Sequence, residues 1–290
     1  MFAHEFMRNA FLAGTFIALA CGLVGYFVVL RSQVFAGDAL SHVAFTGALA
    51  AAAAGVDISL GLFVVTVGVA AGMGLLGRSA RPDDVVIGSV LAWILGLGAL
   101  FLSIFIATAS GSNSTAAVRV LFGSILGLSA ADTRLAVALA VLAAAGLLGL
   151  ARPLLLSSLD PEVAHGLGVP VGALGIAFLV LLGIVAAEAT QAVGALLLLG
   201  LLAAPGATAR LLTDRPWRGL WISAAVAVGS MWGGLTLSYE VDSLPASTAV
   251  VGVAACAFVL AGLWDLARGS RSRRRPASGQ TEPQPSPGSW

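Results

Sequence analysis

Long apolar runs follow one another along this chain of 290 residues, and they limit what it can fold into. A helix needs about 20 apolar residues to cross the hydrocarbon core of a bilayer, which is about 30 Å thick. The runs are rich in Leu, Val and Ala without strict alternation, so they predict helices rather than barrel strands. Nine runs of about that length occupy residues 9–30, 34–54, 58–77, 85–109, 133–150, 171–187, 192–212, 217–237 and 244–266.

The composition agrees with a chain built for lipid. Hydrophobic residues make up 59% of the chain and charged residues 10%, whereas a soluble domain carries about 25% charged residues. We therefore predict an all-α fold, a polytopic membrane bundle of about eight or nine transmembrane helices over residues 1–267. The net charge of +1 gives no electrostatic basis for binding nucleic acid. The lipid bilayer is the partner that the composition requires.

The basic residues indicate an orientation. All fifteen are arginines, and most of them follow the first, third, fifth, seventh and ninth runs. The positive-inside rule places these ends in the cytoplasm, so the C-terminus is predicted cytoplasmic and the N-terminus external, although Arg119 and Arg134 then lie on the external side. Residues 268–290 are predicted to form a disordered basic, Pro-rich cytoplasmic tail. That tail either lies near anionic headgroups or acts as a plain stop-transfer anchor.

The second run contains the strongest candidate for chemistry. Asp38 and His42 are four residues apart and Ser41 is three from Asp38, so a helix directs all three to one face. A carboxylate and an imidazole are good ligands for Mn(II), Fe(II) or Zn(II). The alternative is an Asp–His hydrogen bond that joins two helices. One pair does not complete a coordination shell, but a symmetric dimer would bring two pairs to its axis.

A short amphiphilic stretch between the fifth and sixth runs has the signals of a capped helix. Asp160 suits the N-cap, Pro161 suits the first helical position, and Gly166 can end the helix. On the cytoplasmic face, such a helix could be gripped by a motor protein, or it could be an ordinary connector. His165 is predicted to face solvent or the partner rather than a metal.

Two further segments carry weaker signals. Pro205 lies deep in an apolar run, so a kink is predicted, and Gly206 and Thr208 keep the helix thin at that level, which suits either a pore lining or hinge or plain tight packing. The external loop after the eighth run contains Glu240 and Asp242. They are expected either to attract cations or meet a delivery protein, or else to lie in a plain solvated turn. Glu188, at the external end of the sixth run, gives a similar and weaker signal.

The motifs of enzymes are absent from the sequence. It contains no G-x-x-x-x-G-K-[ST] phosphate loop, no H-E-x-x-H and no convincing pairing of a nucleophile with a base. We therefore expect a transport subunit that is not itself an enzyme and has no intrinsic cofactor. The chain is also not expected to bind ATP in the usual way.

Several short segments occur in a specific order along the chain. They are GYFVVLR at 25–31, FAGDALSH at 35–42, LFG at 121–123, DPEVA at 160–164 with GV at 168–169, VGALL at 193–197, PGATAR at 205–210 and DSLP at 242–245. In this order they resemble the permease subunits of the bacterial zinc/manganese/iron ABC importer family, over nearly the whole chain to about Arg268.

The resemblance implies partners, cargo and roles for particular residues. It implies a homodimer of permeases in the bacterial cell membrane, two cytoplasmic ATP-binding subunits and an external metal-binding (solute-binding) protein. The transported ion would be zinc or manganese, or else iron. It implies that Asp38 and His42 bind the metal and that the segment coupled to the ATPase contains Asp160, Pro161, Glu162, Ala164 and Gly168. The residues expected at the pore or hinge are Pro205, Gly206 and Thr208, and those expected at the external gate are Glu240, Asp242 and Pro245.

Two other functions remain open from the sequence. The first is a permease for a metal chelate of the siderophore, haem or cobalamin type, in which Asp38 and His42 would be structural. The second is a membrane protein that transports nothing, such as an intramembrane enzyme or an assembly scaffold.

Overall fold

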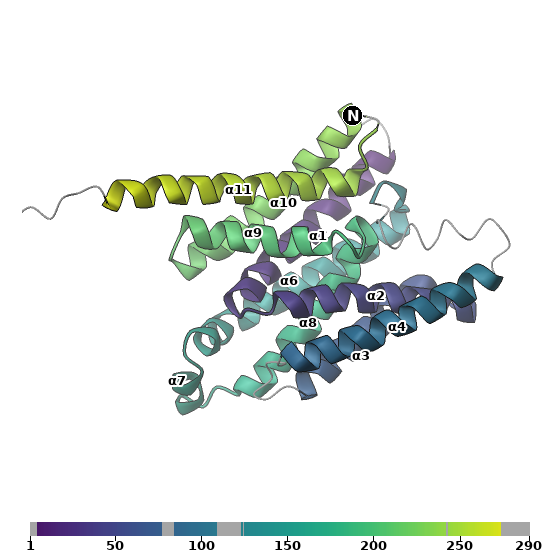
Figure 1. The fold of residues 1–290 in the computed structure, drawn as a ribbon, viewed down its shortest axis with the longest axis horizontal. Coiled ribbons are helices and arrows are strands. Elements are labelled where there is room, and N and C mark those ends of the chain that lie inside the picture. Colours follow the sequence, from purple (N-terminus) through teal and green to yellow (C-terminus); the bar gives the residue numbers. More distant parts are fainter. Residues whose placement is uncertain (1–4, 77–83, 109–122, 124, 242, 274–290) are drawn as a thin grey trace, which may run out of the picture.

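The computed structural model describes residues 5–76, 84–108, 123, 125–241 and 243–273, and these residues fold into helices (Figure 1). No strand occurs among them, so the prediction of an all-α bundle is confirmed. In chain order the elements are α1 (Glu5–Leu30), α2 (Val34–Ala54), α3 (Ile58–Leu76), α4 (Asp84–Thr108), the 3-10 turn η1 (Ile125–Gly127), α6 (Ala130–Leu159), α7 (Pro161–Gly166), α8 (Val171–Val193), α9 (Leu198–Leu212), α10 (Pro216–Glu240) and α11 (Ala246–Arg273).

Eight of the described helices are long and apolar enough to cross a membrane. These are all the α-helices except α7 and α9. With its 15 residues, α9 is about 22 Å long at 1.5 Å per residue, so it covers most of the hydrocarbon depth. The predicted number of about eight or nine spans is therefore confirmed.

The break between α8 and α9 differs from the predicted boundary. The sequence suggested one run over residues 192–212, but α8 continues to Val193 and α9 begins at Leu198. Gly194 between them has φ 93° and ψ 155°, a conformation that glycine adopts without steric penalty. Hydropathy remains high across this break, so the apolar pattern alone did not reveal it.

Two groups of helices are joined by α6 and α8. α1, α9, α10 and α11 pack together, and α2 packs against α3 and α4. In Figure 1 these groups lie in the upper and lower parts of the molecule, with α6 between them and α8 rising from the lower part. α8 contacts α3, α6, α2 and α1, so it ties both groups together. α4 packs mainly against α2, and Thr46 donates a hydrogen bond across this contact to the carbonyl oxygen of Ile94 (3.1 Å).

Small residues allow α1 to approach its neighbours closely. A Cβ atom added to Gly206 of α9 would lie 2.6 Å from the carbonyl oxygen of Gly25 in α1. On another side of α1, the hydroxyl of Ser223 in α10 donates to the carbonyl oxygen of Gly22 (2.6 Å). These contacts bring backbones together, as small residues commonly do between membrane helices. They fix α1 as the buried centre of its group.

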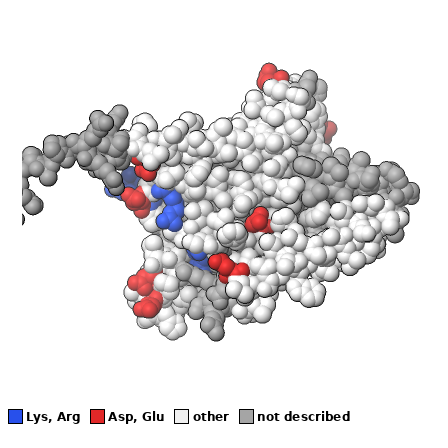
Figure 2. Space-filling view, viewed as in Figure 1, with Lys and Arg blue, Asp and Glu red and all other residues white. Residues whose placement is uncertain are grey.

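Basic side chains gather at one end of the molecule. α7 and the C-terminal end of α11 lie at the left in Figure 1, and Figure 2 shows the arginines of this face at the same end. This distribution is the one that the positive-inside rule associates with a cytoplasmic side. The orientation stays a prediction. α11 continues to Arg273, and residues 274–290 of the predicted tail lie outside the described residues.

Candidate functional site

The described residues cover one stripe of the surface of α2 only in part. Phe35 is 68% exposed, and Asp38, His42 and Phe45 are half-buried. Their spacing of three, four and three residues places them on one helix face. Most other positions of α2 are buried. The sequence-predicted pair therefore lies on the partly exposed side of α2.

The opposite face of α2 is held by close packing. A Cβ atom at Gly37 would lie 2.7 Å from Cδ2 of Leu202 in α9. Ser41, which was expected on the face of Asp38 and His42, is fully buried instead, and its hydroxyl donates to the backbone carbonyl of Asp38 (2.6 Å). The hydroxyl of Ser41 is therefore used in a hydrogen bond within α2. The candidate ligands are the carboxylate of Asp38 and the imidazole of His42.

The depth and the ligand number of this pair limit what it can do. His42 lies eight residues beyond Val34, or about 12 Å along the helix at 1.5 Å per residue. That distance is well inside a hydrocarbon core of about 30 Å. Among the described residues, no group of three or more His, Cys, Asp and Glu side chains could hold a metal ion. Among the described residues, Asp38 and His42 therefore offer two ligand side chains, fewer than a metal site of protein side chains needs.

The corner between α1 and α2 is anchored by Arg31. This residue is buried, and its Nη1 donates to the hydroxyl of Ser158 near the end of α6 (3.2 Å). Its guanidinium carbon also lies 5.4 Å from the ring centroid of Phe178 in α8, within the range of a cation–π interaction. Arg31 therefore joins the corner that leads into α2 to the helices on both sides of α7.

α7 has the predicted caps. One carboxylate oxygen of Asp160 accepts hydrogen bonds from the backbone N–H groups of Glu162 (3.1 Å) and Val163 (3.0 Å), and Pro161 occupies the first turn. Ala164 is the buried residue of this helix. Gly168 follows it with φ 78°. The short helix that the sequence predicted from capping chemistry is confirmed, and its role remains a prediction.

Exposed apolar side chains surround α7. Leu159, Val163 and Leu167 recur at four-residue intervals and are each at least half exposed. Glu162 and His165 are exposed as well, in agreement with the prediction for His165. A short helix that shows both apolar and charged side chains offers a partner protein a mixed surface of the kind found at protein interfaces.

The segment around Pro205 packs inside the protomer. Pro205, Gly206 and Thr208 are buried, and the hydroxyl of Thr208 donates to the carbonyl oxygen of Ala204 within the same helix (2.8 Å). Gly206 faces the backbone of Gly25. Of the two uses that the sequence left open, tight packing is the one that these contacts show, and the pore or hinge role stays a prediction.

The predicted external gate is only partly described. Glu240 is the last residue of α10, and both it and Pro245 are exposed. The hydroxyl of Ser238 donates to the carbonyl oxygen of Leu244 (2.8 Å), which closes the loop between α10 and α11. Asp242 lies outside the described residues.

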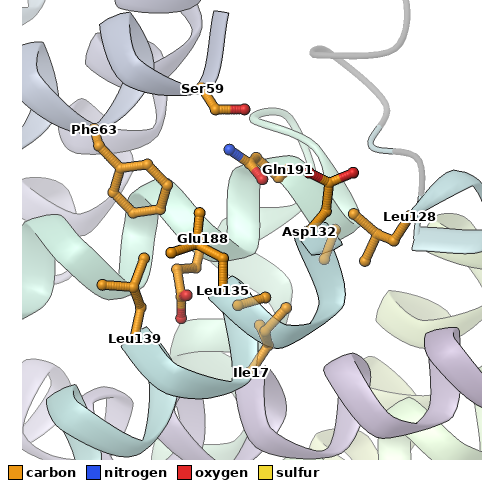
Figure 3. Close-up of a pocket in the computed structure, with 11 residues that line it drawn as sticks. Ile17, Ser59, Phe63, Leu128, Asp132, Leu135, Leu139, Glu188 and Gln191 are labelled. Carbon is orange, nitrogen blue, oxygen red and sulfur yellow. The ribbon is translucent and has the colours of Figure 1, made fainter. Parts of the chain in front are cut away.

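Glu188 lies in the interior of the protomer. Sequence reasoning gave it a weak role at the external end of a run, but α8 extends beyond it to Val193 and its side chain is 2% exposed. It lines a small cavity with residues of α1, α3 and α6 (Figure 3). An acidic residue directly after a predicted span that ends at residue 187 was the available signal, because such residues are costly if the helix continues through the membrane.

Comparison with known proteins identifies the family. The sequence model of the family described as "ABC 3 transport family" matches residues 3–264. The chain belongs to the ABC 3 transport family. It is therefore a multi-pass membrane component of an ABC transporter and works with other ABC transporter subunits.

Individual relatives are similar along nearly their whole length. The chain is 30% identical over 274 residues to the manganese transport system membrane protein MntC of Halalkalibacterium halodurans, which covers 94% of this chain and 92% of the relative. It is 29% identical over 258 residues to a probable iron transport system membrane protein of Haemophilus influenzae, with 89% and 93% covered.

Two solved structures have a similar fold. PsaBC from Streptococcus pneumoniae in complex with Fab matches with a TM-score of 0.77 at 26% identity, over 89% of this chain and 91% of that chain. An inward-facing conformation of a putative metal-chelate type ABC transporter matches with a TM-score of 0.67 at 19% identity, over 89% and 85%. The second likeness concerns the fold alone.

Proposed function

We propose that this chain is the permease of an ABC importer for a divalent transition-metal ion, with manganese or zinc as the first candidates and iron as the third. Membership of the ABC 3 transport family supports the transporter class. Relatives named for manganese and iron transport support the class of cargo. The metal ion is the substrate of this protein and passes through it.

The position of Asp38 and His42 carries the proposal. They lie one helical turn apart, well inside the membrane, on the partly exposed stripe of α2. Polar side chains at this depth are costly and mark ion pathways. Carboxylate and imidazole groups bind Mn(II), Fe(II) and Zn(II), whereas Cu(I) prefers sulfur ligands. The pair can therefore hold a dication briefly on its way across.

A second copy of the chain would complete the site. Within a protomer the pair lacks further acidic, histidine or cysteine partners among the described residues. A two-fold axis beside the α2 stripe would bring Asp38 and His42 together twice and supply four ligand side chains. Such a site lies on the dimer axis, where an ion has a path between the protomers. Such a site should bind the ion only loosely, because a transported ion must also be released.

Partner ATPases would drive the transport cycle through α7. Its exposed surface, with Asp160, Pro161 and Glu162 at its start, is the proposed docking surface for two cytoplasmic ATP-binding subunits. Movement of α7 would reach α2 through Ser158, Phe178 and Arg31, which connect the helices around α7 to the corner before α2. ATP-driven closure of the motors would thus alter access to Asp38 and His42.

The opposite end of the molecule would receive the ion. We place the loop between α10 and α11, with Glu240 and Pro245, on the external side of a bacterial cell membrane, where a metal-binding protein would dock. The C-terminus is then cytoplasmic, in keeping with the arginines at the end where α7 lies (Figure 2).

Uptake by the double variant Asp38→Asn/His42→Gln tests this function. The complex with its ATPase and binding protein is reconstituted in liposomes, and manganese and zinc uptake is measured. Both substitutions keep side-chain size and remove ligand strength, so uptake should fall at least about tenfold while assembly of the complex is retained.

Asp57→Asn provides the matched control. Asp57 accepts a hydrogen bond from the backbone N–H of Leu60 (2.9 Å) at the start of α3 and is exposed, so this variant should transport at the normal rate. Normal metal uptake by the Asp38→Asn/His42→Gln variant would refute the assignment. Uptake of a ferric chelate in preference to the free ions would instead favour a chelate permease.

A further inference from the structure

Glu188 is a buried acid with no hydrogen-bond partner among the described residues. It lies in the last two turns of α8, is 2% exposed, and neither of its carboxylate oxygens has a hydrogen-bond partner in the part of the chain that the structure describes. An ionised carboxylate in such surroundings is costly because nothing replaces the water that it loses. Its charge therefore has to be compensated by a ligand.

The cavity beside Glu188 is small and has two kinds of wall. Its volume is about 20 Å³, about the space that one water molecule needs. In Figure 3 the polar ends of Ser59, Asp132 and Gln191 lie on one side, whereas the carboxylate of Glu188 lies next to Leu135 and Leu139. Asp132 is exposed, so we take the polar side as the mouth of the cavity, and the buried carboxylate lies at the apolar side.

The size of the cavity selects the ligand. A hard divalent ion takes six or more oxygen ligands, and the described residues offer no group of three or more His, Cys, Asp and Glu side chains for a metal. A single water-sized space also leaves no room for an ion that keeps its hydration shell. No Lys, Arg or His is among the described residues that line the cavity. The ligand that fits is a proton, delivered by one water molecule.

The other titratable groups near Glu188 come from two helices. α6 brings Asp132, whose Oδ2 accepts hydrogen bonds from the backbone N–H (3.2 Å) and the hydroxyl (2.7 Å) of Ser129 in a capping box. α1 brings the buried thiol of Cys21. α3 contributes Ser59 and Phe63 to the cavity, neither of which is charged.

α2 also packs against α8. It presents Ala44 and Ala48 to Ala187, next to Glu188 in the chain. Among the described residues that line the cavity, no positive charge compensates Glu188.

We propose that Glu188 is a proton-binding site that reports whether the external half of the protomer is closed. While α1, α3, α6 and α8 enclose the cavity, the carboxyl group keeps its proton. When the mouth past Asp132 and Gln191 opens, water enters, the O–H bond breaks, and the proton leaves as hydronium while the carboxylate becomes hydrated. An acidic exterior therefore favours the closed arrangement, and an alkaline exterior favours the open one.

Infrared spectroscopy of the full chain in lipid nanodiscs tests the proton directly. The difference spectrum between acidic and alkaline buffer should contain a carboxyl C=O band that is lost in Glu188→Gln and shifted in Glu188→Asp. The Asp38→Asn/His42→Gln variant should retain the band, so this result is independent of the transport function proposed above. A spectrum unchanged in both Glu188 variants would overturn the site.

Metal binding distinguishes the alternative ligand. Manganese titrated into the Asp38→Asn/His42→Gln variant should find no site that depends on Glu188. If manganese did bind, and if this binding were lost on adding Glu188→Gln, the ligand of Glu188 would be a metal ion and the proposal would be overturned.

Thiol labelling tests the link to opening. Leu139→Cys places a thiol at the apolar side of the cavity, in a Cys256→Ser background because Cys256 is exposed. The rate at which this thiol is labelled should rise with pH more steeply than in the same protein that also carries Glu188→Gln. In that control the thiol keeps its intrinsic pH dependence, but the glutamine at position 188 cannot ionise. Equal slopes in the two proteins would show that the cavity does not respond to Glu188, and the coupling would be wrong.

Discussion

At the scale of single residues, Gly206 determines how closely α9 approaches α1. The atoms that an added Cβ would meet are the backbone oxygen and carbon of Gly25 and the backbone nitrogen of Tyr26, at 2.6, 2.9 and 3.1 Å. Backbone atoms within a helix cannot rotate away as a side chain can. Any larger residue at 206 must therefore separate the two helices.

We expect Gly206→Ala to lower the stability of the folded chain by about 1–3 kcal/mol, the usual cost of overpacking. The melting temperature in detergent measures the effect. Gly68→Ala is the control, because a Cβ atom there meets nothing within 4 Å and alanine favours the helix by up to about 1 kcal/mol. Equal melting temperatures for the two variants would contradict this account of the α1–α9 contact.

The sequence allowed candidate residues to be selected, but it did not predict which side chains surround them in the fold. Asp38 and His42 could be selected because charged and imidazole groups at helical spacing are conspicuous in an apolar run. Their placement on a partly exposed stripe could not, because the covering residues, such as Leu182 and Leu202, are distant in sequence. For the same reason, the sequence placed Glu188 next to a loop, whereas tertiary packing buries it.

At the scale of elements, Arg31 connects the helices around α7 to α2. Arg31→Ala removes a charge-assisted hydrogen bond to Ser158 and the contact with Phe178. A hydrogen bond to a charged group contributes about 1.5–3 kcal/mol, so metal uptake per ATP hydrolysed should fall about tenfold or more while ATP hydrolysis continues. Ion uptake and phosphate release measured together in liposomes give this ratio.

Two variants separate coupling from general damage. Arg152→Ala removes an exposed arginine of α6 and should keep the normal ratio of ions to ATP. Adding Ser158→Ala to Arg31→Ala should cost little more than Arg31→Ala alone, because both remove the same contact. Fully additive losses, or a fall in ATP hydrolysis that matches the fall in uptake, would be inconsistent with a coupling role.

Helix existence was more predictable than helix length. α7 followed from Asp160 and Pro161, whose capping roles depend only on local chemistry. The fifth run was expected to end at residue 150, yet α6 continues through Pro153 to Leu159. Neighbouring helices can stabilise a proline inside a membrane helix, and such support is not visible in a single segment.

At the scale of the whole molecule, the stripe on α2 predicts where two copies meet. Phe35 lies one turn from Asp38 and is 68% exposed. In a Cys256→Ser background, Phe35→Cys should form a disulfide between two chains on mild oxidation, seen as a dimer on a non-reducing gel. Leu260→Cys on α11, at 66% exposure, should stay monomeric. Dimers at Leu260→Cys alone would place the interface elsewhere.

The attachment of α4 has a mechanical consequence. α4 packs mainly against α2, with only a minor contact to α3, and much of its surface faces outward. The two helices are therefore expected to shift as one body, α4 following whenever α2 is displaced. Lipid must flow aside for that motion, so membrane viscosity becomes a source of drag on each turnover.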